Sequence, residues 1–78
     1  MLEMQHKKMV GARIVYYRKI SGMTQEYLAE LVGISPQYLS KIENGNYNKN
    51  ISLSVLIGIA EKLNVKIAQL VQDIDSGE

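Results

Sequence analysis

The sequence predicts an all-α domain of five helices. Val, Ile and Leu recur at helical spacing, and Pro, Gly, Ser and Asn interrupt this pattern at short intervals. No segment shows a convincing strand pattern. With 78 residues, 46% of them hydrophobic and 22% charged, the chain has the size and composition of one folded domain. We expect that domain to span residues 8–72, between a flexible segment 1–7 and an acidic, frayed tail 73–78.

The first helix is expected from about Lys8 to Ser21. Val10, Ile14 and Tyr17 fall on one face of this segment, with the spacing of an inward-facing helical stripe. Gly22 supplies the stop, because glycine readily adopts the backbone conformation that ends a helix.

The second helix is expected to start behind Thr24 and to end at Gly33. Thr24 is a good N-cap, and Gln25 and Glu26 fill the first turn. The inward-facing residues of this helix are expected to be Leu28, Leu31 and Val32, with Ala29 beside them.

The third helix has the clearest sequence signals. Ser35 is a candidate N-cap, and Pro36 sits at the first helical position, where a missing N–H costs nothing. Asn44 and Gly45 form a C-terminal stop that accepts positive φ. Two apolar residues are expected to face inward, Leu39 and Ile42.

The fourth and fifth helices follow a polar loop at residues 45–50. Ser52 opens the fourth helix, and a short fifth helix follows Asn64. The inward stripe of the fourth helix is expected to consist of Leu53, Leu56, Ile59, Ala60 and Leu63. The fifth helix is expected to carry Ile67, Leu70 and Val71.

The composition excludes several kinds of site. There are no cysteines, so disulfides and cysteine-rich zinc sites cannot form. His6 is the single histidine, and Asp73 and Asp75 lack the spacing of a calcium loop. No groups are placed for acid–base or nucleophilic catalysis. We therefore expect no enzyme, no metal, no cofactor and no small-molecule ligand.

The two ends of the chain differ in charge. Residues 1–50 carry seven Lys/Arg and four Asp/Glu, a balance of +3, whereas residues 51–78 carry two and four, a balance of −2. This asymmetry either arises by chance or marks a first half that faces phosphates. The first ten residues contain no apolar run of signal-peptide length, and nothing approaches a transmembrane length, so a cytoplasmic location is expected.

Residues 25–44 have the form of a helix-turn-helix unit, two short helices joined by a tight turn that contains glycine. Ala29 falls where the two helices approach each other, and a larger side chain there would push them apart. Gly33 falls in the turn, where a positive φ is needed. The apolar wedge between the helices is expected to be Leu28, Val32, Ile34, Leu39 and Ile42.

Two segments carry a resemblance to a known family: TQEYLAELVGISPQYLSKIENG, residues 24–45, and ISLSVLIGIAEKLNV, residues 51–65. Together with an arginine in the first helix, they make residues 10–71 similar to the Cro and phage-repressor (XRE) family of helix-turn-helix regulators. The resemblance implies a lambda-repressor-like fold and a homodimeric transcriptional regulator. Its partner would be double-stranded DNA with a near-palindromic operator.

In that family the third helix lies in the major groove. The residues that the resemblance places at base edges are Ser35, Pro36, Gln37, Tyr38, Ser40 and Lys41. Gln37 suits bidentate pairing with adenine, and Lys41 suits donation to guanine. Taken without the resemblance, both also fit a merely solvated surface. Pro36 stands where family members often carry glutamine, so base readout is expected to rest on fewer side chains.

Phosphate contacts are expected from helix N-termini and from the loop after the third helix. The candidates are Gln25, Asn44, Tyr47, Asn48, Lys49 and Arg18. For the loop residues, a solvated loop is an equally good interpretation. Arg13 and Lys19, on the first helix, are also within reach of the DNA backbone. The resemblance further implies a structural pair between Arg18 and Glu43.

Several apolar residues lie outside the inward-facing stripes, and they predict a two-fold homodimer interface. These residues are Ile51, Val55, Ile57, Gly58, Val71 and Ile74. A glycine inside a helix costs up to about 1 kcal/mol relative to alanine, and close approach by another helix would explain Gly58.

The leading interpretation is a stand-alone DNA-binding regulator, similar in layout to controllers of restriction–modification systems and to small phage regulators. Two alternatives stay open. One is a protein-interaction module such as an antitoxin-like subunit, and the other is a DNA-binding fragment of a larger regulator. Salt-dependent binding to duplex DNA favours the regulator, whereas tight one-to-one binding to another protein favours the module.

Overall fold

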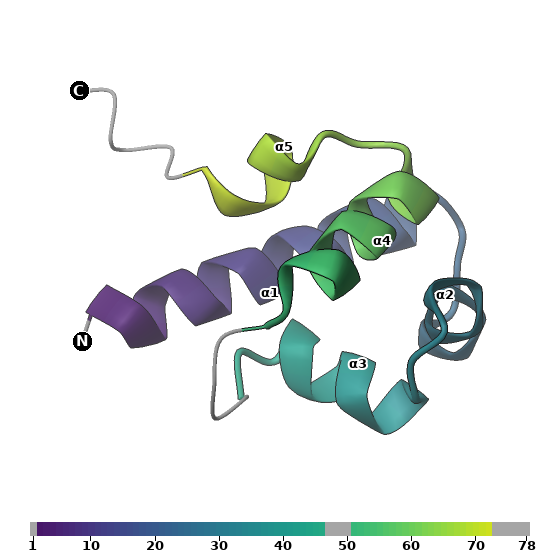
Figure 1. Cartoon of the computed structure of the whole chain (residues 1–78), viewed down its shortest axis with the longest axis horizontal. Coiled ribbons are helices and arrows are strands. Elements are labelled where there is room, and N and C mark those ends of the chain that lie inside the picture. Colours follow the sequence, from purple (N-terminus) through teal and green to yellow (C-terminus); the bar gives the residue numbers. More distant parts are fainter. Residues whose placement is uncertain (1, 47–50, 73–78) are drawn as a thin grey trace.

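Five helices account for most of the chain in this computed structural model, which describes residues 2–46 and 51–72. In chain order they are α1 Leu2–Ile20, α2 Gln25–Val32, α3 Pro36–Glu43, α4 Leu53–Leu63 and α5 Ile67–Val71 (Figure 1). The described residues include no strand, so the predicted all-α fold is confirmed.

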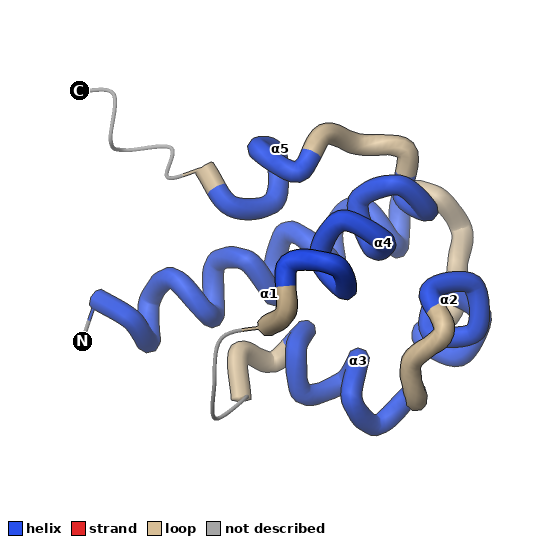
Figure 2. Tube along the Cα trace, viewed as in Figure 1, coloured by secondary structure: helices blue, strands red, loops and turns tan. Residues whose placement is uncertain are grey.

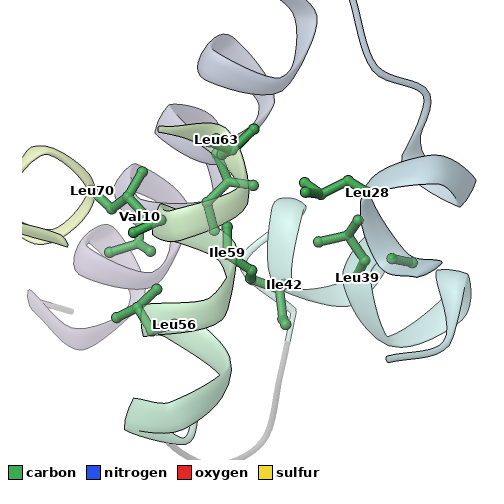
Figure 3. Packing of buried hydrophobic residues seen from close by; sticks show 11 residues of the cluster. Val10, Leu28, Leu39, Ile42, Leu56, Ile59, Leu63 and Leu70 are labelled. Atoms are coloured by element: carbon green, nitrogen blue, oxygen red, sulfur yellow. The ribbon is translucent and has the colours of Figure 1, made fainter. Parts of the chain in front are cut away.

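The long helix α1 packs against α3, α4 and α5, while α2 packs against α3 and α4 (Figure 2). The core between them contains residues from every helix (Figure 3). The six largest side chains that are fully buried in it are Ile14, Leu28, Leu39, Ile42, Ile59 and Leu70. Each contributes about 1.5–3 kcal/mol by leaving water, so α3 is fixed to the rest of the domain by burial of its inner face.

Three predicted N-caps are present in the structure. The side chains of Thr24, Ser35 and Ser52 each accept a hydrogen bond from the backbone N–H three residues later. The distances are 3.0, 3.0 and 3.1 Å, to Tyr27, Tyr38 and Val55 respectively. Each such cap contributes about 1 kcal/mol, so the starts of α2, α3 and α4 are fixed locally.

The start of α1 differs from the prediction. The helix begins at Leu2 rather than near Lys8, so residues 2–7 belong to it, although they were expected to precede it. The segment contains Glu, Met, Gln and Lys, which are good helix formers, and no residue before Gly11 breaks it. The prediction followed the apolar periodicity, which starts only at the first residue that reaches the core.

Leu53 was expected in the inward stripe of α4, and this is wrong, because 65% of its surface is exposed. It is the first residue of the helix and lies at its end, whereas the other four expected residues are buried. In α2, Leu28 and Ala29 are buried, while Leu31 and Val32 are only half-buried.

Candidate nucleic-acid interface

The turn between α2 and α3 is closed by its own backbone. Gly33 adopts a φ of 88°, in the left-handed region where a side chain would be strained. The N–H groups of Gly33 and Ile34 both donate to the carbonyl oxygen of Ala29, at 2.8 and 3.0 Å. Ala29 itself is fully buried. The crossing of α2 and α3 therefore depends on a small residue and a glycine at the positions that the sequence predicts.

The recognition-helix candidate α3 has two distinct faces. Leu39 and Ile42 are fully buried in the core. Gln37 and Lys41 are exposed and lie one turn apart on the outer face. Of the remaining candidate base-contacting residues, Ser35 and Pro36 are exposed, whereas Tyr38 and Ser40 are half-buried. The outer face thus presents an amide and an ammonium to solvent from a helix anchored on its other side.

A buried polar network holds the C-terminal end of α3. The structure brings Arg18 of α1 and Glu43 of α3 together, with Arg18 9% and Glu43 6% exposed. Arg18 Nε and Nη2 donate to the two carboxylate oxygens of Glu43, at 2.7 and 3.2 Å. Arg18 Nη1 donates to the carbonyl oxygen of Met23, at 2.9 Å. Because the bidentate geometry is directional, the network fixes the orientation of α3 relative to α1 and to the start of α2.

Gln25 joins this network, which the sequence did not predict. Its Nε2 donates to Glu43 Oε1 at 2.8 Å, so its amide is engaged inside the protein. If Gln25 contacts a phosphate, it does so mainly through its backbone N–H. This N–H lies in the first turn of α2, where backbone N–H groups have no acceptor within the helix. Arg18 already makes three hydrogen bonds to the protein, so its position favours the structural pair over a phosphate contact.

A close contact between α1 and α3 occurs at Gly11, a residue that sequence analysis missed. A Cβ at this position would lie 2.5 Å from the carbonyl oxygen of Ile42 and 2.7 Å from the carbonyl carbon of Glu43. No side chain fits there unless the two helices separate. The only sequence signal was the glycine inside a helical pattern. Glycine in a helix costs up to about 1 kcal/mol relative to alanine, so its presence there indicates that close packing requires it.

The other phosphate candidates come from different elements. Asn44 caps the helix and is exposed, and Lys19 is exposed on α1. Arg13 instead donates to the carbonyl oxygen of Gln72, which ties α1 to the end of α5. The loop candidates Tyr47, Asn48 and Lys49 lie outside the described residues.

The residues predicted for a dimer interface do not form one uniform surface. Ile57 and Val71 are each 40% exposed, whereas Ile51 and Val55 are half-buried and pack against the core. Gly58 faces α2 of its own chain, since a Cβ there would meet Val32 Cγ1 at 3.5 Å. Its small size therefore needs no second subunit as an explanation. Ile74 lies outside the described residues.

Leu53 adds to the open apolar surface of α4. It precedes Ile57 by one turn, so the two exposed side chains fall on the same side of the helix. The sequence prediction placed Leu53 in the core and so left it out of the interface. In the structure, the pair Leu53 and Ile57 forms the main unpartnered apolar stripe of α4.

Within the residues described, no group of three or more His, Cys, Asp or Glu side chains is placed to hold a metal ion. None of the helices found there is both long and apolar enough to cross a membrane.

These features define a helix-turn-helix domain with a solvent-facing third helix. The family model described as "Helix-turn-helix" matches residues 14–70. The chain belongs to this helix-turn-helix family.

Relatives with known names agree with this assignment. Control protein C.SmaI of Serratia marcescens is 33% identical over 67 residues, which cover 86% of this chain and 77% of that protein. The restriction–modification controller protein C.AhdI of Aeromonas hydrophila has a crystal structure that superposes with a TM-score of 0.74 and 30% identity, over 81% of this chain and 92% of that one.

A second similar structure is that of the master regulator for biofilm formation SinR in complex with DNA. It superposes with a TM-score of 0.75 and 38% identity, over 82% of this chain and the whole of that chain. The fold also occurs in an enzyme, Fe(II) HppE in complex with substrate, with a TM-score of 0.76 and 26% identity, but there it accounts for only 43% of the chain. The fold alone therefore does not define a function.

Proposed function

We propose that this chain binds double-stranded DNA as a two-fold homodimer in the cytoplasm and regulates transcription. The observation that carries the proposal is α3, whose polar outer face is free while its inner face and C-terminal end are fixed by the core and the Arg18–Glu43 pair. Similarity to SinR, solved with DNA, to control protein C.SmaI and to the restriction–modification controller protein C.AhdI supports it. The proposal includes no catalytic step.

In this proposal α3 enters the major groove, and its exposed residues meet base edges. Gln37 pairs with adenine and Lys41 with guanine, because amide and ammonium groups at those positions match the acceptors and donors of these bases. Ser35, Pro36 and Tyr38 line the N-terminal part of the helix and contribute mainly shape, since the Ser35 hydroxyl already caps the helix.

Phosphate contacts position the protein without reading sequence. We assign them to the exposed Asn44, to the first turn of α2 at Gln25, and to Tyr47, Asn48 and Lys49 in the loop after α3. The first turn of α2 suits this role because its free N–H groups and the positive end of the helix dipole attract an anion.

The homodimer uses the exposed apolar stripe of α4. Leu53 and Ile57 are exposed one turn apart on α4, and α5 adds a further exposed apolar residue, Val71. A two-fold contact must be self-complementary, and an apolar stripe meets that condition easily. Two recognition helices would then reach successive major grooves, about 34–36 Å apart.

Selection of bound sequences from a random pool of duplex DNA tests this function. The expected product is a near-palindrome with two half-sites one helical turn apart, because two symmetric copies of α3 read it. A pool that yields no enriched sequence, together with no salt-dependent binding of duplex DNA, would contradict the proposal.

A further inference from the structure

A lysine on α1 lies directly against the end of the recognition helix. Gly45 follows Asn44, the C-cap of α3, and a Cβ at Gly45 would lie 2.9 Å from both Cα and Cγ of Lys8. The backbone and the start of the side chain of Lys8 therefore pack on Gly45. One turn further along α1, Gly11 makes its close contact with the last carbonyl groups of α3. Two successive turns of α1 thus lie against the same end of α3.

The arrangement places Lys8 beside the C-terminal end of α3. The N-terminal turns of α1 extend past the C-terminal end of α3 (Figure 1). Residues 2–7, which the sequence prediction left outside the helix, continue α1 in this direction. Lys8 lies within α1, as the sequence predicted, and its backbone contact with Gly45 defines its position relative to α3.

The charge of Lys8 is available to a ligand. Lys8 is exposed, and no carboxylate of the described residues is paired with it. The one acidic residue of α3, Glu43, is buried and is neutralised by Arg18. Lys8 thus presents a cation to solvent beside the end of α3. Helix α3 itself has no exposed carboxylate that would compete with a phosphate for this cation.

We propose that Lys8 is a further DNA-backbone contact, which binds a phosphate flanking the major groove at the C-terminal end of α3. This inference rests on the proposed function. A helix in the major groove has a phosphate backbone on either side, so a cation packed against the end of that helix lies next to one of them. An ammonium suits this contact because it needs no particular angle to the phosphate oxygens. In a homodimer the contact occurs twice.

The test is the salt dependence of binding to a duplex oligonucleotide of fixed arbitrary sequence, measured by fluorescence anisotropy. A phosphate contact is independent of sequence, so no operator is needed. The variant Lys8→Gln removes the charge and keeps a good helix former. The matched control is Lys62→Gln, which removes the same charge from an exposed residue in the last turn of α4.

For Lys8→Gln, the slope of log K against log salt should become less steep by about 0.9 per protomer. The ratio of wild-type to variant affinity should then shrink by about threefold per protomer between 50 and 200 mM salt. Lys62→Gln should keep the wild-type slope, and Lys8→Arg should restore it. If Lys8→Gln lowers the thermal stability, Lys8→Met keeps the unbranched stem that packs on Gly45 and should flatten the slope equally.

Two outcomes would overturn the inference. One is a wild-type slope in both Lys8→Gln and Lys8→Met, and the other is equal flattening by Lys62→Gln, which would indicate an effect of net charge alone. Failure of the wild-type chain to bind duplex DNA at any salt concentration would instead refute the proposed function, so the two failures are distinguishable.

Discussion

Replacing Glu43 by glutamine tests whether the buried network fixes the position of α3. Glutamine keeps the size and shape of the side chain but removes the negative charge that compensates Arg18. The two side chains are only 11% and 3% exposed, and Glu43 accepts three hydrogen bonds, two from Arg18 and one from Gln25. After the substitution, one acceptor oxygen becomes an NH₂ group that faces N–H donors.

The expected loss is large relative to the stability of the domain. Removing one partner of a buried ion pair costs about 3–5 kcal/mol, because the remaining charge stays buried without compensation. A domain of this size has a free energy of unfolding of about 4–12 kcal/mol. Each kcal/mol shifts the melting temperature of so small a domain by about 4–8 °C, so we expect a decrease of at least about 12 °C.

The assay is thermal and urea unfolding followed by far-UV circular dichroism, at equal protein concentrations because the proposed dimerisation would contribute to stability. Glu30→Gln is the control, since it removes the same charge from an exposed residue of α2 and should change stability by less than about 0.5 kcal/mol. The double variant Arg18→Met with Glu43→Leu removes both charges and should be more stable than Arg18→Met alone. Equal melting temperatures for Glu43→Gln and Glu30→Gln, or strictly additive losses in the double variant, would refute the reasoning.

Two further predictions follow from the structure, and a third follows from the sequence of the segment after α3. Gly11→Ala should destabilise by about 1–3 kcal/mol in urea unfolding because α1 must move away from α3, whereas Gly58→Ala, whose Cβ has ordinary contact, should be neutral or stabilise by up to about 1 kcal/mol. Ile57→Lys should give a folded monomer with weak DNA binding; sedimentation showing the wild type as a monomer at high concentration, free and on DNA, would contradict the interface. Lys49→Ala should weaken all duplexes about equally and flatten the salt slope, and a loss confined to one sequence would argue against a phosphate contact.

The elements that could be predicted from the sequence are those with local causes. Ser35 and Pro36 mark the start of α3, and Gly33 marks the turn, because capping, a missing N–H and a positive φ are properties of single positions. The inner face of α3 followed from the spacing of Leu39 and Ile42 in the same way.

The parts that could not be predicted depend on which elements meet in space. The exposure of Leu53 and the closeness of Gly11 to α3 follow from where helices end and cross, which periodicity does not encode. The hydrogen bond from Gln25 to Glu43 joins residues 18 positions apart. The family resemblance implied the Arg18–Glu43 pair but assigned Gln25 to phosphate, and this left the internal role of its amide unseen.

The most direct test of the central claim is the affinity of the wild type, Gln37→Ala and Lys41→Ala for the selected operator and for each of its single-base variants. If α3 reads bases in the major groove, each substitution should cost about 1–3 kcal/mol on the operator and abolish discrimination at one position per half-site. Binding to unrelated duplex DNA should change much less. Equal weakening of operator and unrelated DNA by both variants, with discrimination retained at every position, would contradict the placement of α3.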